Sequence, residues 1–401
     1  MLRKVFKWVV VAFICLVSIY AVWVIVAMNR VATISVDYVA LLNESAAAIP
    51  DDQRAWPLYR EAAISLKNFP EPDTVFIDED IDKPTLPDQE GWNHYRDWID
   101  SHAKTIETIH IGASKHGVGL ILDGTISEDD KNLWPDEYES QQNAEQQNGF
   151  LASILVPHLG HYREMARLLS IDAKDSAASG YASRCIKDIG SMIAIGIHTR
   201  EHPILINDLV SFSIFNHTFS TLNEILDQYS YLFSSDQLEE LSKELQQLNG
   251  NMSIRFEGER MFLLDLLQRM YTDDGNGDGK IVPIEAAKTL SYIEPISPEL
   301  TSFSLVPAIF APVADVFLAS RKELLEEYDR RISYFKSKSV SSSNNSGYVG
   351  EPLSPSTSTI NPFFLMELLT PAYEKAIKHA NETRENRDDI LKRVILFQQA
   401  K

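Results

Sequence analysis

The apolar run Trp8–Met28 contains no charged residue, and it constrains what the chain can fold into more than any other stretch. A helix needs about 20 such residues to cross the roughly 30 Å hydrocarbon core of a bilayer, where it satisfies its own backbone hydrogen bonds. The basic residues before the run are Arg3, Lys4 and Lys7, and residues 31–53 contain no Lys or Arg. This bias predicts a cytoplasmic N-terminus and an extracytoplasmic location, in the periplasm or cell envelope, for residues 30–401.

A cleaved signal peptide is the alternative to this anchor. Its apolar core spans about 7–15 residues and ends at a small-x-small cleavage site. The run here is longer, and the flank Ala27-Met28-Asn29-Arg30 does not provide such a site. We therefore expect residues 1–29 to be a cytoplasmic tip and an uncleaved transmembrane anchor that contacts the lipid bilayer through residues 8–28.

Residues 274–285 are the one stretch in which residue type and spacing together specify a chemistry. The stretch resembles the EF-hand calcium-binding loop family at every fixed position of the motif D-x-[DN]-x-[DN]-G-x5-E. The resemblance implies a calcium ion whose ligands are Asp274, Asn276, Asp278, the backbone carbonyl of Lys280, and Glu285. It also implies a sharp turn at Gly279, where a positive φ is cheap only for glycine.

The flanks of the loop fit a helix–loop–helix unit. Apolar residues recur at helical spacing before it, and Pro283 stands where the second helix would begin. The ninth loop position, Val282, has no side-chain ligand, and two further glycines loosen the empty loop. We expect a weak structural site, with a dissociation constant of about 10⁻⁴–10⁻³ M. The alternative is a turn between two helices that binds no metal.

No second calcium loop accompanies the first in the sequence. Asp78–Asp82 carries carboxylates at loop positions 1, 3 and 5, but Lys83 and Gln89 stand at the sixth and twelfth positions. We interpret this stretch as a solvated acidic loop. Because sensor proteins use paired loops, the unpaired loop favours a structural role over a calcium-responsive switch that exposes an apolar groove.

The remaining sequence predicts an all-α fold. A helical extracytoplasmic domain is expected over residues 30–338, a Ser/Pro-rich linker over 339–360 and a C-terminal helix over 361–401. The 3.6-residue period is plainest at Cys185, Ile186, Ile189, Met192 and Ile193. Ser234 and Gln237 have the spacing of a capping box. The layout, and the short run 164–169 (EMARLL), also resemble uncharacterised membrane-anchored proteins of planctomycete-type bacteria, a likeness that implies no activity.

The composition restricts the partners. A formal net charge of −20 repels nucleic-acid phosphates, so no nucleic-acid partner is expected. Cys15 lies in the membrane run and Cys185 in an apolar helix, so we expect no disulfide and no reactive thiol.

Residues 198–202 read His-Thr-Arg-Glu-His and have the HxxEH spacing of inverted zinc peptidases. On a helix, His198 and His202 would share a face, with Glu201 as general base. Pro203 follows directly, and no motif marks a third ligand, so we expect a solvated helix end. A weaker metal pattern is the row His158, His161 and Glu164. The carboxylates Asp172, Asp175 and Asp188 are expected to form a solvated face.

These patterns together favour a membrane-anchored calcium-binding protein with a single EF-hand-like site and a structural or protein-binding role, whose protein partner the sequence does not name. The alternative is a zinc-dependent hydrolase that uses the motif at 198–202. No other catalytic constellation stands out, and enzymatic activity is not indicated.

Overall fold

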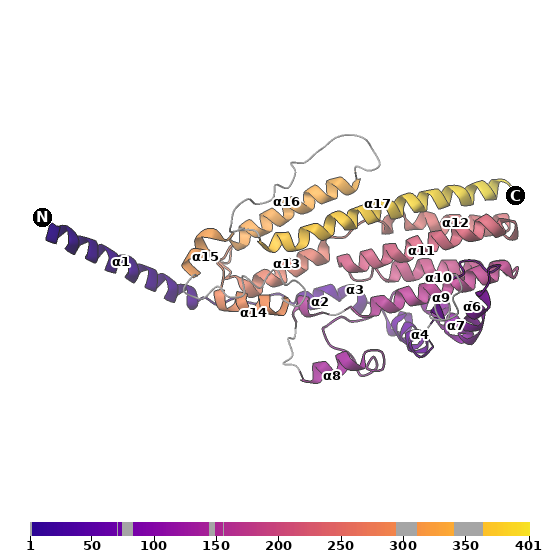
Figure 1. The fold of residues 1–401 in the computed structure, drawn as a ribbon, viewed down its shortest axis with the longest axis horizontal. Helices are drawn as coiled ribbons and strands as arrows, with labels where there is room; N and C mark the ends of the chain where they lie inside the picture. The colour runs from indigo at the N-terminus through magenta and orange to yellow at the C-terminus, as the bar shows by residue number, and fades with distance from the viewer. Residues whose placement is uncertain are drawn as a thin grey trace. The chain divides into compact units, whose positions relative to one another are not determined.

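The computed structural model describes residues 2–69, 71–73, 83–143, 149–154, 156–293, 311–340 and 364–401. Every regular element in these ranges is a helix, and the extended contacts among them are isolated bridges (Figure 1). The all-α prediction is therefore confirmed for this part of the chain. The acidic stretch Asp78–Asp82 and residues 341–360 of the expected linker lie outside the described residues.

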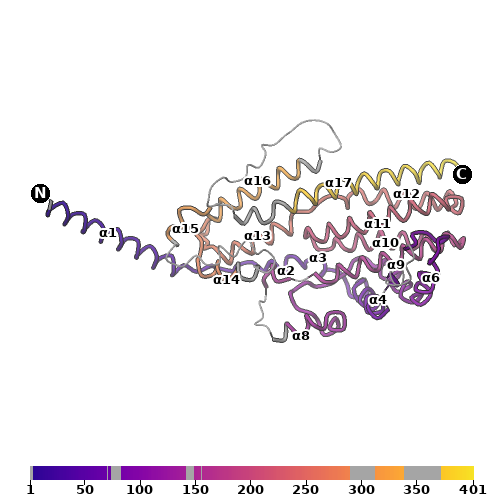
Figure 2. The backbone as a smooth tube through the Cα atoms, viewed as in Figure 1, coloured from indigo at the N-terminus to yellow at the C-terminus, as the bar shows by residue number. Residues whose placement is uncertain are grey.

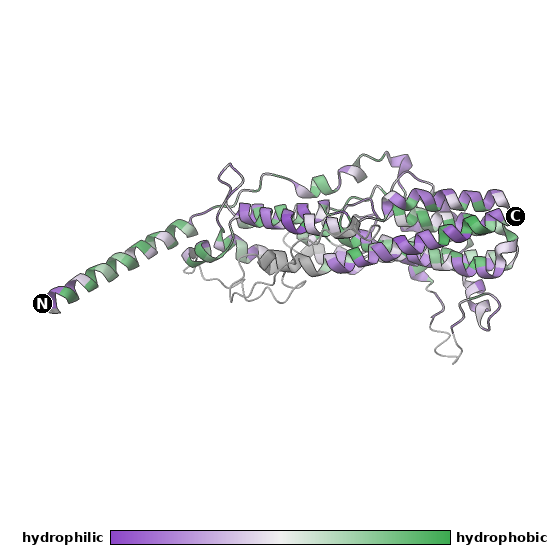
Figure 3. Ribbon diagram, turned by 90° about the horizontal axis from the view of Figure 1, so that it is seen from above, coloured by the Kyte–Doolittle hydropathy of each residue, from purple (hydrophilic) through white to green (hydrophobic). Residues whose placement is uncertain are grey.

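The N-terminal helix α1 (Leu2–Met28) is apolar along most of its length (Figure 3). Its stretch Arg3–Met28 has a mean hydropathy of 2.9, and the helix is long enough to cross a membrane. Large apolar side chains along it are exposed, for example Phe13 and Ile19. A membrane span and a signal sequence both have these properties.

The chain forms two compact units. Unit 1 comprises residues 1–38, 150–153 and 260–374, and unit 2 comprises residues 39–149, 154–259 and 375–401. The elements that contribute to unit 1 are α1, η2 (Leu151–Ser153), α13 (Glu257–Met270), α14 (Pro283–Ile293), α15 (Ala311–Phe317), α16 (Arg321–Val340) and the first part of α17 (Phe364–Gln399).

Unit 2 contains most of the shorter helices and the main apolar core. Its elements are α2 (Tyr38–Leu42), α3 (Glu44–Ala47), η1 (Asp51–Gln53), α4 (Trp56–Asn68), α6 (Trp92–Ser101), α7 (Ala103–Ala113), α8 (Pro135–Asn143), α9 (His158–Ala178), α10 (Ala182–His198), α11 (Leu205–Tyr229), η3 (Ser230–Leu232), α12 (Ser235–Gln247), η4 (Leu248–Asn251) and the end of α17. Helices α9, α10 and α11 pack side by side (Figure 2). The predicted apolar stripe on α10, with Cys185, Ile189 and Met192, is buried among them, which confirms that prediction.

The start of α12 is fixed by the capping box that the sequence predicts. The Ser234 side chain accepts a hydrogen bond from the backbone N–H of Gln237, and the Gln237 side chain accepts one from the backbone N–H of Ser234. Each bond satisfies a backbone donor that a helix N-terminus otherwise leaves unpaired.

Helices α10 and α11 approach closely at Gly196. A Cβ atom at this position would lie 2.3 Å from Cε1 of Phe215, whose side chain is fully buried. The Ser211 hydroxyl on α11 donates a 2.6 Å hydrogen bond to the Gly196 carbonyl oxygen. The absence of a side chain at Gly196 therefore sets the distance between two core helices.

We expect Gly196→Ala to lower the free energy of unfolding by about 1–3 kcal/mol, because the buried Phe215 ring has no room to move away. Gly160→Ala on α9 is the control, since a Cβ there meets nothing within 4 Å. This control should raise stability by up to about 1 kcal/mol, because alanine favours the helix. Urea unfolding followed by circular dichroism measures both, and equal stability of the two variants would contradict the packing account.

Candidate functional site

The predicted calcium loop joins α13, which ends at Met270, to α14, which begins at Pro283. Backbone hydrogen bonds close the base of the loop: the N–H of Thr272 donates to Lys280 at 2.9 Å, and that of Val282 donates to Met270 at 2.8 Å. An isolated antiparallel bridge between Tyr271 and Ile281 accompanies them. The stretch thus forms a helix–loop–helix unit.

The acidic residues of the loop bind its own backbone. The Asp274 Oδ1 atom accepts hydrogen bonds from the N–H groups of Asn276 at 2.7 Å and Asp278 at 3.1 Å. Gly275 and Gly277 have φ values of 80° and 87°, in the left-handed region that glycine adopts without strain. The residue types of the motif therefore produce a tight turn in which Asp274 accepts backbone N–H groups of the loop.

Gly279 is required for a different reason from the one the motif suggests. Its φ is not positive, so the expectation of a left-handed turn at this position is wrong. A Cβ atom here would lie 1.8 Å from the carbonyl oxygen of Thr272. The glycine is needed because the two sides of the loop pass so close together.

The loop also contacts the start of α16. Asp278 Oδ1 accepts hydrogen bonds from the backbone N–H groups of Gly279 at 2.7 Å and Lys322 at 3.2 Å. Burial alone would raise the pKa of the Asp278 carboxyl, but the hydrogen bonds from Ser320 and from these backbone groups outweigh it and lower that pKa. Arg321 adds an ion pair to Asp273 at 2.6 Å. Asp278 therefore acts as an ionised cap on α16.

The five predicted ligands are all oxygen donors, which suits a hard cation such as calcium. Asp274, Asn276 and Asp278 lie in one turn, whereas the Glu285 carboxylate pairs with Lys288 at 3.0 Å. The Lys280 carbonyl oxygen already accepts the bond from Thr272. Within the residues that the structure describes, no three acidic, histidine or cysteine side chains gather closely enough to hold a metal ion. The donor chemistry fits calcium, and the ligands are not gathered.

The HxxEH residues begin at His198, the last residue of α10, and are not solvated, so the expectation of a solvated helix end is wrong. His198 is 7% exposed and His202 is 2% exposed. His198 Nδ1 lies 2.8 Å from the Tyr59 hydroxyl, and its Nε2 lies 3.1 Å from the Lys115 carbonyl oxygen. These two contacts occupy both nitrogens of the ring.

Glu201 and His202 are engaged in the same way. The Glu201 carboxylate accepts backbone hydrogen bonds from Val118 at 2.7 Å and Gly119 at 2.9 Å, and His202 Nε2 lies 3.3 Å from Asn43 Oδ1. Burial raises the pKa of Glu201. These side chains hold the segment after α7 and the region of α2 in place, which favours a structural role over zinc ligation.

The carboxylates expected on a solvated face are in fact packed between helices, which corrects that prediction. Asp188 is fully buried, and its Oδ1 lies 2.8 Å from His110 Nε2. Asp172 accepts two hydrogen bonds from Arg184, at 2.7 and 2.9 Å, and Asp175 accepts one from Trp92. Burial, together with the neighbouring Asp172, raises the pKa of Asp188 well above its usual range.

The weaker metal pattern on α9, His158, His161 and Glu164, lies in two different environments. His161 Nδ1 lies 2.9 Å from the Glu164 carboxylate at the surface. His158 is 2% exposed, and with Trp134 and Asp130 it lines a cavity of about 430 Å³. Burial lowers the pKa of His158 to about 3, so its ring is neutral.

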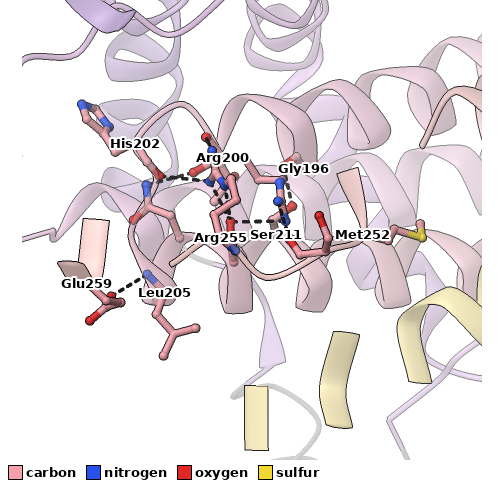
Figure 4. Close-up of polar contacts among 12 residues, drawn as sticks. Gly196, Arg200, His202, Leu205, Ser211, Met252, Arg255 and Glu259 are labelled. Carbon is pink, nitrogen blue, oxygen red and sulfur yellow. Dashed lines mark hydrogen bonds and ion pairs between the residues drawn. The ribbon is translucent and has the colours of Figure 1, made fainter. Parts of the chain in front are cut away.

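A buried ion pair that sequence reasoning missed is centred on Asp208. This fully buried carboxylate accepts the side-chain N–H groups of Arg255 at 2.6 and 3.0 Å and lies 3.2 Å from Nη1 of Arg200. Arg255 also donates to the carbonyl oxygens of Arg200 and His202 (Figure 4). The network connects the turn after α10 to the segment before α13.

One signal in the sequence could have revealed this network. Asp208 stands at helical spacing with Leu205, Phe212 and Phe215, all of which are buried. A charged residue in an apolar stripe requires a buried partner, because an unpaired charge in the interior is strongly unfavourable.

The buried histidines predict a loss of stability in acid. Burial lowers the pKa of His198 and that of His202 to about 4, whereas an unfolded histidine titrates near 6.5. Below pH 6.5 the unfolded chain therefore binds protons that the folded chain does not. The stabilisation from each ring is complete above pH 6.5 and is lost as the pH falls toward 4.

We expect His202→Gln to reduce the acid sensitivity of the protein. Between pH 7 and pH 5 the fall in the free energy of unfolding should be smaller in this variant than in the natural chain, by about 2 kcal/mol for one proton. Urea unfolding at the two pH values measures the difference. Parallel pH dependence in the two proteins would show that His202 does not stay neutral in the folded state.

No protein-family model matches this chain, and no curated protein or solved structure is significantly similar to it.

Proposed function

We propose that the chain is a membrane-anchored helical protein in which loop 274–285 takes up calcium as a structural staple. Helix α1 would hold the protein at the outer face of the membrane, where the basic residues before it keep the N-terminus inside. An extracytoplasmic site meets calcium concentrations at which even a weak site stays filled. The support for this proposal is the complete motif and the position of its loop among three helices.

The observation that carries the proposal is the double role of Asp278. This residue stands at the fifth position of the motif, as its third ligand, and also accepts the backbone N–H of Lys322 in the first turn of α16. The loop connects α13 and α14 through the chain itself. A cation bound by Asp274, Asn276 and Asp278 would therefore stiffen the junction of α13, α14 and α16 at once.

The remaining ligand is the Glu285 carboxylate, on the first turn of α14. In our proposal this carboxylate leaves Lys288 and turns toward the loop when calcium binds. The cation would supply the positive charge that holds the carboxylates of the loop together against their mutual repulsion. Such a site stabilises the folded chain without any large movement, which is the behaviour of a staple and not of a switch.

We expect calcium to stabilise the full-length protein in detergent micelles. With a dissociation constant of about 1 mM, 10 mM calcium contributes about 1.4 kcal/mol, which raises the melting temperature by roughly 2 °C. Glu285→Gln should abolish the shift, and Glu239→Gln, an exposed Glu on α12, should retain it. Calorimetric titration measures binding directly; identical calcium titrations of the natural chain and Glu285→Gln would refute the proposal.

A second substitution separates the capping role of the loop from calcium binding. Without calcium, Asp278→Ala should lower the free energy of unfolding by about 1 kcal/mol, since it removes the hydrogen bond to the first turn of α16. Glu285→Gln should cost little under the same conditions, because the ion pair that the described residues give Glu285 is with the exposed Lys288. Denaturation in a calcium chelator measures both, and equal losses would contradict the cap.

A further inference from the structure

The short helix α15 presents three apolar side chains that are at least one-third exposed among the described residues. Val313, Val316 and Phe317 are 36%, 64% and 52% exposed. Their spacing of i, i+3 and i+4 places them on the same side of the helix. Three large apolar side chains on seven residues are an unusual surface for a segment in contact with water.

Helix α15 lies beside the C-terminal end of α1 within unit 1 (Figure 1, Figure 2). Asp315 makes the connection: it accepts two hydrogen bonds from Arg30, at 2.5 and 2.6 Å, and one from Trp23 Nε1 at 3.1 Å. The side chains of this ion pair are only 15% and 5% exposed. Ala27 is fully buried at the same end of α1.

The contacts of Asp315 with Arg30 and Trp23 fix the position of α15 along the axis of α1. Trp23 lies five residues before Met28 (28 − 23), which is about 7.5 Å along a helix axis. If α1 spans a bilayer, this level is the boundary between hydrocarbon and head groups, where tryptophan side chains gather. Asp315 can lie there because Arg30 neutralises it and Trp23 satisfies one of its oxygens.

We infer that the face formed by Val313, Val316 and Phe317 is inserted into the interfacial layer of the bilayer that α1 crosses. The inference rests on the proposed anchoring by α1, and it adds a second membrane contact, around Asp315, which stands 285 residues after Arg30 in the sequence. The bilayer is the occupant that the packing of α15 against the end of α1 indicates, because the Asp315 contacts lie at the end of the anchor, where Val22, Ile25 and Val26 of α1 are exposed as well. Amphipathic segments of this kind lie about 5–10 Å into the head-group boundary.

Spin labels on the full-length chain in phosphatidylcholine vesicles test the inference. Cys15→Ser removes the exposed native thiol, and Cys185 stays unlabelled because it is 1% exposed. Single cysteines then replace Val316, Ile19 on α1, and Glu326 on α16, whose side chain is 67% exposed. Molecular oxygen concentrates in lipid and a polar nickel complex stays in water, so their collision rates with each label report its surroundings.

We expect the ratio of the oxygen collision rate to the nickel collision rate at position 316 to exceed that at position 326 by about threefold or more, because an interfacial side chain contacts lipid. A ratio at 316 equal to that at 326, with a lipid-like ratio at 19, would overturn the inference and leave the anchor intact. Low collision rates at 316 with both reagents would indicate cover by protein and would also overturn it. A water-like ratio at 19 would refute the anchor and the inference together.

Discussion

Burying the Asp208 carboxylate in unit 2 removes its charge from water, which is strongly unfavourable unless the charge is paired. Asp208 is fully buried, and the positions of Arg255 and Arg200 follow from its need for partners. Removing one partner from such a pair typically costs 3–5 kcal/mol, because the other charge stays buried. The turn after α10 is held by these arginines, so the placement of His198 and His202 depends on this ion pair as well.

The helices themselves could be predicted, because apolar periodicity and capping are local. The stripe from Cys185 to Met192 and the capping box at Ser234 needed only neighbouring residues. Asp188 stands in the same stripe, yet a carboxylate is ordinarily exposed, and its partner His110 is 78 positions away in the sequence. Burial of such a group depends on a contact that no local pattern encodes.

In the candidate site, too, the local features could be predicted from the sequence and the long-range contacts could not. The turn formed by Asp274 and Asp278 follows from the local motif, and the structure contains it. The contact of Asp278 with α16 joins residues 44 positions apart, and it could not be read from the twelve residues of the loop. The solvated helix end expected at 198–202 is wrong for a related reason: three residue types at helical spacing do not reveal that Glu201 accepts the backbone N–H groups of Val118 and Gly119.

The close approach of Gly279 to the Thr272 carbonyl changes what the motif can reveal about metal binding. Any side chain at position 279 would collide with the opposite side of the loop in the arrangement described here. Selection for folding alone would therefore preserve this glycine after calcium affinity had been lost. In a chain of this kind, the carboxylate at the twelfth position is the better record of metal binding, because the loop closes without it.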